Sequence, residues 1–145
     1  MAGIERFENR VLGLDTAPLI YLIEDHPAYA DRLARFFESA RQSRVRMVTS
    51  VVTLVEVLVK PLREGQLALI ERYRNILVNS AELTTLPVTR EIAERAARLR
   101  AAYSLRTPDA IQVATALTAG AAAFLTNDAG LRKVGDLEVL TLADL

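Results

Sequence analysis

The sequence has no cysteine and a single histidine, His26. The absence of cysteine excludes disulfide bonds, thiolate metal sites and a cysteine nucleophile. His26 lies in the segment Asp25-His26-Pro27, which breaks the surrounding periodicity, so we interpret it as a structural or solvated loop residue and not as a general base.

Long hydrophobic runs are also absent. No apolar stretch approaches the ~20 residues that span a bilayer, and the N-terminal segment MAGIERFENR is too charged for a secretory signal. A length of 145 residues with 51% hydrophobic residues predicts a single domain over residues 1–145 with a substantial core. We therefore expect a soluble, cytoplasmic protein that does not enter membranes.

The chain has no net charge, because 18 basic residues balance 18 acidic ones. A neutral chain is unlike proteins that coat nucleic acids by bulk electrostatics. Among the basic residues only Lys60 and Lys133 are lysines, and arginine binds phosphate and carboxylate groups through two parallel hydrogen bonds. For any single arginine, a solvated face or a partner contact remains the preferred interpretation over substrate binding.

Short apolar runs alternate with segments of helical periodicity along the whole chain. We predict strands at residues 11–15, 44–49, 83–88, 122–126 and 137–140, and helices at 16–24, 29–42, 50–60, 66–79, 89–100 and from 107 onward. Pro61 and Gly65 are expected to mark the end of the third helix. This alternation predicts an α/β fold of three layers, with a central, mostly parallel sheet of four to five strands flanked by helices.

The segment Ser50–Lys60 places one acid, Glu56, in a run of valine and leucine. On a helix, Thr49, Thr53, Glu56 and Lys60 would form one narrow polar stripe. So thin a stripe favours a core helix that turns its valines into the core and one edge toward a wet cleft. The alternative is an ion pair between Glu56 and Lys60 at the edge of the core, worth ~0.2–0.5 kcal/mol.

Four acids stand out by position. Asp15 ends the first predicted strand, Asp128 follows the fourth, Asp109 lies in the first turn of a late helix, and Glu56 is in the helix after the second strand. Ligand sites in parallel α/β sheets lie beyond the carboxyl ends of the strands, so these acids can meet there. Taken singly, Asp15 and Asp109 are also favoured helix-start residues, and Asp128 and Asp136 are typical turn residues.

Several carboxylates in one small cleft repel one another unless a cation is present. An all-oxygen site selects a hard ion, Mg²⁺ or Mn²⁺, over zinc. With the four acids set aside as metal ligands, 18 basic residues face 14 acidic ones, a balance of +4 that suits an anionic substrate.

Four segments, in order and at suitable spacing, carry a resemblance to a known family: LDTAPLIYLIE, SVVTLVEVLVKP, RTPDAIQVATAL and FLTNDAGL. The chain resembles PIN-domain ribonucleases, and most closely the VapC-type toxins of bacterial toxin–antitoxin pairs. The resemblance runs from Leu14 to about Leu131. It implies a PIN domain over the whole chain.

The same resemblance implies the residues of the site. Asp15, Glu56, Asp109 and Asp128 correspond to the family's metal-binding, catalytic acids, and the loop of the fourth acid varies within the family, which leaves Asp136 as its alternative. The supporting or site-lining residues are Thr16, Thr126 and Asn127.

The implied activity is endoribonuclease activity, with hydrolysis of RNA phosphodiester bonds in the presence of Mg²⁺ or Mn²⁺. The implied assembly is a homodimer inhibited by a cognate antitoxin protein. Arg106, close to Asp109, is a candidate for binding a substrate phosphate, and a surface salt bridge is its simpler role.

Two other functions are compatible with the chain. One is a PIN-fold scaffold that binds a partner or RNA without cutting it. The other is a phosphatase of the haloacid dehalogenase type, in which a strand-end Asp is the nucleophile. Asp15 is suitably placed for such a phosphatase, but Ala17 occupies the position of its second acid.

Overall fold

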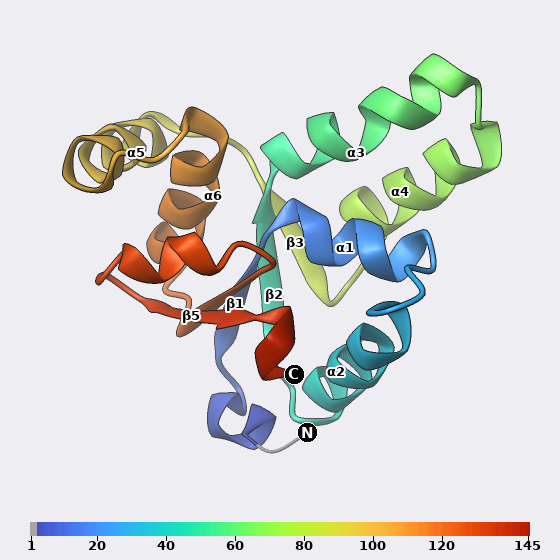
Figure 1. Ribbon diagram of the computed structural model, residues 1–145, viewed down its shortest axis with the longest axis horizontal. Coiled ribbons are helices and arrows are strands. Elements are labelled where there is room, and N and C mark those ends of the chain that lie inside the picture. Colours follow the sequence, from blue (N-terminus) through green and yellow to red (C-terminus); the bar gives the residue numbers. More distant parts are fainter. Residues whose placement is uncertain (1–2) are drawn as a thin grey trace.

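The computed structural model describes residues 3–145 and contains one sheet of five parallel strands (Figure 1). Their order in the sheet is β3-β2-β1-β4-β5. The central strand β1 pairs with β2 on one side and β4 on the other, so that Leu12 lies opposite both Met47 and Ala123. The predicted parallel sheet is confirmed. The strands are β1 (Val11–Leu14), β2 (Arg46–Ser50), β3 (Leu83–Leu86), β4 (Ala123–Thr126) and β5 (Glu138–Thr141).

Helices cover both faces of the sheet, which gives the expected three layers (Figure 1). The core on one face joins the sheet to α1, α2 and α4, and the core on the other face joins it to α5 and α6. None of the helices in residues 3–145 is both long and apolar enough to cross a membrane. The helices are α1 (Thr16–Ile23), α2 (Ala30–Gln42), α3 (Val51–Glu64), α4 (Leu67–Asn79), α5 (Arg90–Tyr103) and α6 (Thr107–Thr118), with short 3-10 helices η1 (Ile4–Phe7), η2 (Ala129–Lys133) and η3 (Leu142–Asp144).

The predicted elements are all present, and their ends differ by a few residues. The largest difference is in α3, which continues through Pro61 and ends before Gly65. Pro61 lacks an N–H donor, yet it is buried, and its carbonyl accepts the N–H of Gln66 at 2.9 Å. Gly65 stops the helix because it adopts the left-handed conformation, with φ 68°.

The exposed side of α3 corrects one expectation. Val57 is 2% exposed, whereas Val55 is 64% exposed and Val59 is 46% exposed, so the valines do not all enter the core. The physical reason is that α3 packs mainly on α4 and only lightly on α1 and α6. The pair α3–α4 forms a helical hairpin that projects from the sheet (Figure 1).

Gly13 on β1 allows α6 to approach the sheet closely. A Cβ atom at this position would lie 2.5 Å from the Cβ of Ala116 and 2.9 Å from the ring of Phe124, and both distances are too short. We expect Gly13→Ala to lower the free energy of unfolding by about 1–3 kcal/mol, because strand and helix must separate. Urea unfolding measures this loss. Gly135→Ala is the control, because a Cβ there meets only the Tyr103 hydroxyl, at 3.7 Å; equal losses in the two variants would contradict the packing argument.

Candidate active site

The chain topology brings three helix N-termini to the carboxyl end of the sheet. Helices α1 and α3 begin directly after β1 and β2, and α6 begins at the same end because it leads back into the parallel strand β4 (Figure 1). Asp15 is the N-cap residue of α1, and Asp109 lies in the first turn of α6. Asp128 follows β4 and caps η2. Three of the four predicted acids therefore stand at strand or helix ends on this edge.

Asp15 is held by two hydrogen bonds. Its Oδ1 accepts the backbone N–H of Thr16 at 2.9 Å, and its Oδ2 accepts the hydroxyl of Thr126 at 2.7 Å. Burial raises the pKa of the Asp15 carboxyl, these two bonds oppose the rise, and the nearby charges of Asp109 and Glu56 add to it. Asp15 is thus a desolvated acid beside two other acids, an environment that favours a nearby cation.

Glu56 is directed toward α1 and not along its own helix. Its Oε1 accepts the hydroxyl of Thr16 at 2.8 Å, which bridges α3 and α1. Lys60 forms no salt bridge within residues 3–145, so the alternative of a Glu56–Lys60 pair is not found there. Glu56 is an exposed residue, and its carboxylate accepts a hydrogen bond from Thr16, the residue that follows Asp15.

A buried polar network lies beneath Glu56. The amide of Gln112, on α6, donates to the hydroxyls of Thr53 at 2.6 Å and Thr16 at 3.2 Å, and its oxygen accepts the N–H of Ser50 at 3.3 Å. The hydroxyl oxygen of Thr49 lies 2.7 Å from that of Thr53, and the Thr49 hydroxyl donates to the carbonyl of Leu14. These contacts join the starts of α1 and α3 to α6.

Gln112 was not among the site residues predicted from the sequence. A signal was available, since Gln112 lies three residues after Asp109 and therefore on the same side of α6. Thr49 and Thr53 did appear in the predicted polar stripe, and the structure shows that both are buried beneath the site and not exposed to a cleft.

Asp109 is paired with an arginine. The Nε of Arg106 lies 3.1 Å from the Oδ2 of Asp109, with side-chain exposures of 81% and 17%. Asp109, and more weakly Asp128 and Glu56, raise the pKa of the Arg106 guanidinium. The guanidinium therefore lies within the field of three of the four predicted acids.

Asp128 and its neighbours form the other side of the site. Asp128 is exposed; its Oδ1 accepts the N–H of Gly130, and its own N–H is bonded to Thr126, the residue that also holds Asp15. Asn127 is exposed and donates to the hydroxyl of Tyr21. Asp136 accepts the hydroxyl of Tyr103 at 2.7 Å, so it is bound to α5. Of the two candidates for the fourth acid, only Asp128 shares a partner with Asp15.

The donor chemistry of this edge fits a hard divalent cation, because the acids and threonines supply only oxygen. Within residues 3–145, no three histidine, aspartate or glutamate side chains are close enough together to hold a metal ion as they stand. Asp109 forms a salt bridge with Arg106, and Glu56 accepts a hydrogen bond from Thr16. Binding of one ion by several of these acids would therefore require their side chains to turn toward it.

Solved structures with a similar fold come from bacterial toxin–antitoxin complexes. VapBC2 from Rickettsia felis, bound to a promoter DNA fragment, aligns with a TM-score of 0.72 at 15% identity, covering 90% of this chain and 98% of that one. A toxin–antitoxin complex from Klebsiella pneumoniae aligns with a TM-score of 0.69 at 24% identity, covering 93% of this chain and 99% of that one. VapBC-5 from Mycobacterium tuberculosis aligns with a TM-score of 0.55 at 25% identity, covering 90% of this chain and 96% of that one.

No curated protein sequence matches the chain as a relative. The model of the PIN domain family, by contrast, matches residues 13–137, which include all four predicted acids together with Arg106 and Gln112. The chain therefore belongs to the PIN domain family, a family of nucleases.

Proposed function

We propose that this protein is a metal-dependent endoribonuclease and the toxin of a toxin–antitoxin pair, acting on RNA in the cytoplasm. The observation that carries the proposal is the environment of Asp15, a carboxylate desolvated at the end of the central strand and flanked by the charges of Asp109 and Glu56. Membership of a nuclease family and the similarity to toxin–antitoxin structures support the same function.

Each site residue has a role in this proposal. Asp15, Asp109, Glu56 and Asp128 would hold Mg²⁺ or Mn²⁺. The bound ion would neutralise negative charge at the phosphodiester and lower the pKa of the attacking water. Thr126 orients Asp15, and the Thr16 hydroxyl orients Glu56. Arg106, 3.1 Å from Asp109, would contact a phosphate of the substrate, a group that arginine can bind through two parallel hydrogen bonds.

Purified protein, incubated with a structured RNA, tests the activity. Cleavage should appear on addition of Mg²⁺ or Mn²⁺ and stop with EDTA. Binding of the RNA without cleavage under any metal condition would instead favour the non-catalytic scaffold. A phosphatase of the haloacid dehalogenase type is disfavoured by Ala17, and release of phosphate from a phosphomonoester would be its signature.

An antitoxin protein is the proposed partner, since the similar structures from Rickettsia felis and Klebsiella pneumoniae are toxin–antitoxin complexes. An apolar cavity of about 210 Å³ between α1, α2 and α4 suits an apolar side chain of such a partner; Leu22, Phe37 and Ile76 are among its lining residues. Co-purification with the product of a short reading frame beside this gene, and loss of RNA cleavage in that complex, would support the assignment.

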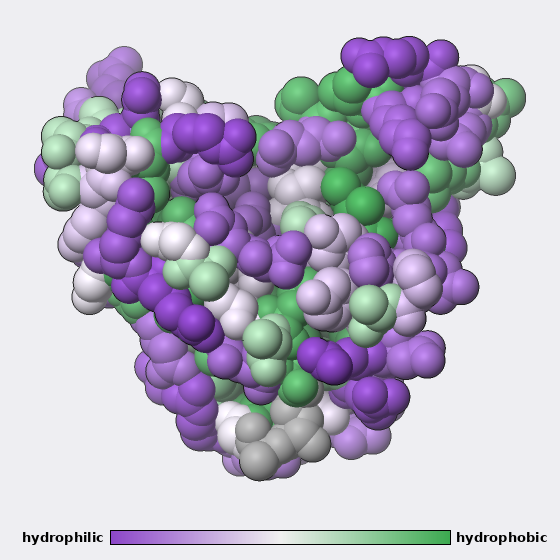
Figure 2. All heavy atoms as spheres, viewed as in Figure 1, coloured by the Kyte–Doolittle hydropathy of each residue, from purple (hydrophilic) through white to green (hydrophobic). Residues whose placement is uncertain are grey.

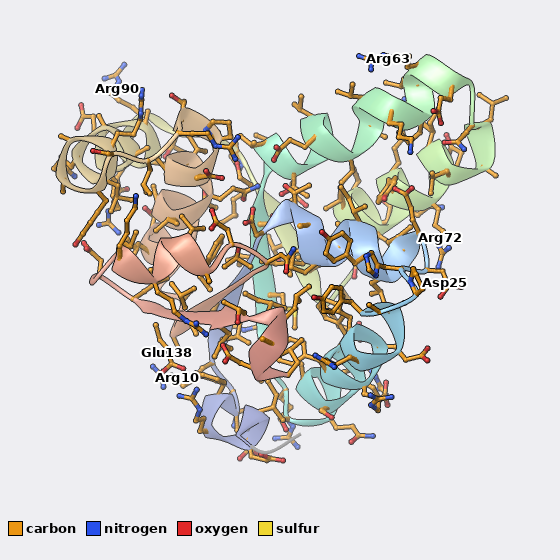
Figure 3. The ribbon with its side chains drawn as sticks, viewed as in Figure 1. Arg10, Asp25, Arg63, Arg72, Arg90 and Glu138 are labelled. Carbon is orange, nitrogen blue, oxygen red and sulfur yellow. The ribbon has the colours of Figure 1, made fainter. Side chains whose placement is uncertain are left out.

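A second copy of the chain is the proposed occupant of the exposed side of α3. Val55, Val59 and Leu62 recur there at helical spacing, and hydrophobic atoms follow α3 and α4 in Figure 2. Both signs of charge flank this stripe, with Arg63 at the outer end of α3 in Figure 3 and Glu64 next to it. A two-fold interface can pair such charges reciprocally, so the surface suits self-association.

Val59→Glu is expected to convert a dimer to a monomer, because a charge in the centre of an apolar interface is left without a partner. Light scattering coupled to size-exclusion chromatography measures the mass. Val88→Glu, at an exposed valine between β3 and α5, is the control and should remain dimeric. A wild-type chain that is monomeric at high micromolar concentration would refute the homodimer.

A further inference from the structure

Arg106 forms a salt bridge with one of the predicted acids, Asp109. It is the N-cap residue of α6, and Pro108 at the start of this helix restricts the backbone between Arg106 and Asp109. Its guanidinium reaches Asp109 at 3.1 Å, and the Arg106 side chain as a whole is 81% exposed. The group is therefore tethered at the edge of the site and free to swing into solvent.

The surroundings of Arg106 are acidic on more than one side. Besides Asp109, which contacts the guanidinium at 3.1 Å, the charges of Glu56 on α3 and of Asp128 after β4 act on it more weakly. An isolated surface pair between residues three apart would involve one acid. Here one acid, Asp109, contacts the guanidinium, and two acids from other segments add weaker charge interactions.

A divalent ion and a guanidinium compete for the same Asp109 oxygen, and the two cations repel each other at short range. On the basis of the proposed function, we propose that Arg106 is a resident counter-ion that Mg²⁺ or Mn²⁺ must displace from Asp109. The arginine offsets the charge of Asp109 while no metal is bound, and it raises the metal concentration needed to load the site. In this role Arg106 is a positioning residue that acts through Asp109.

Titration calorimetry with Mn²⁺ alone, in the absence of RNA, tests the displacement. Arg106→Gln keeps most of the side-chain length and removes the charge. We expect this variant to bind Mn²⁺ about three- to tenfold more tightly than the wild type, the range of a modest ion-pair competition. Mn²⁺ should also raise the melting temperature of Arg106→Gln more than that of the wild type.

Two further variants separate the possible outcomes. Arg95→Gln removes the same charge from α5 at a residue that makes no salt bridge within residues 3–145, and it should leave the Mn²⁺ affinity within twofold of the wild type. Asp109→Asn should weaken Mn²⁺ binding at least about tenfold. An unchanged affinity in Asp109→Asn would overturn the metal site itself. If the wild type binds Mn²⁺ clearly but Arg106→Gln binds it no more tightly than the wild type or Arg95→Gln does, the counter-ion role alone is overturned.

Discussion

Asp15→Asn is expected to lower the rate of RNA cleavage by about 10²–10³-fold, the scale of losing several kcal/mol of charge stabilisation in the transition state. Asparagine has the shape of aspartate, and its carbonyl can still accept the N–H of Thr16, so α1 keeps its cap. It removes the negative charge that a divalent ion requires. Initial rates on one structured RNA in Mn²⁺, at saturating protein, measure the change. Full activity in this variant would refute the proposed function.

The free energy of unfolding, measured as a function of pH, shows whether Asp15→Asn is folded and whether Asp15 is desolvated in the wild type. The pKa of Asp15 is raised above its ordinary value of 3.8, so the native state binds more protons than the unfolded state in this range. In EDTA, the wild type should therefore lose stability as the pH rises from about 4 through the raised pKa of Asp15. Asp15→Asn lacks this loss, so its stability relative to the wild type should increase over that interval. Parallel curves for the two proteins would contradict the desolvation of Asp15.

The fold was largely predictable because its local signals agree with one another. Thr107-Pro108-Asp109 has the composition of a helix start, and α6 begins at Thr107. Pro61 was misleading as a stop signal, since the surrounding contacts tolerate a proline that local preference disfavours. The exposed valines of α3 could not be predicted from periodicity, because valine and leucine occupy nearly every position and no apolar face is distinguishable.

The positions of the site acids could be predicted from a topological rule. Their hydrogen-bond partners could not, because these bonds join segments that are distant in the sequence. Strand ends in a parallel sheet must share an edge, which is sufficient to place Asp15 and Asp128. The bond from Tyr103 that holds Asp136 on α5 joins residues 33 positions apart, and nothing in the local sequence indicates it. The Thr16–Glu56 bond is of the same kind, since it exists only because α1 and α3 cross at the edge of the sheet.

Gln112→Met is expected to have the largest effect among changes that leave the acids intact. Methionine has a similar volume and fills the space, but it has no amide to bond to Thr53 and Thr16 or to accept the N–H of Ser50. Gln112 is 2% exposed, so water does not readily replace these contacts. We expect a loss of roughly 2–4 kcal/mol in the free energy of unfolding, because buried polar groups are left without partners.

The matched control is Thr115→Val, on the same helix and equally buried. The Thr115 hydroxyl donates to the carbonyl of Ile111 within α6, so its removal leaves the contacts between helices intact and should cost about 1 kcal/mol or less. Only Gln112→Met should also weaken Mn²⁺ binding, because it frees Thr16 and with it the orientation of Glu56. Urea unfolding and Mn²⁺ calorimetry on both variants separate the two effects. If both variants lose the same stability and keep wild-type Mn²⁺ affinity, the buried network beneath Glu56 does not support the site.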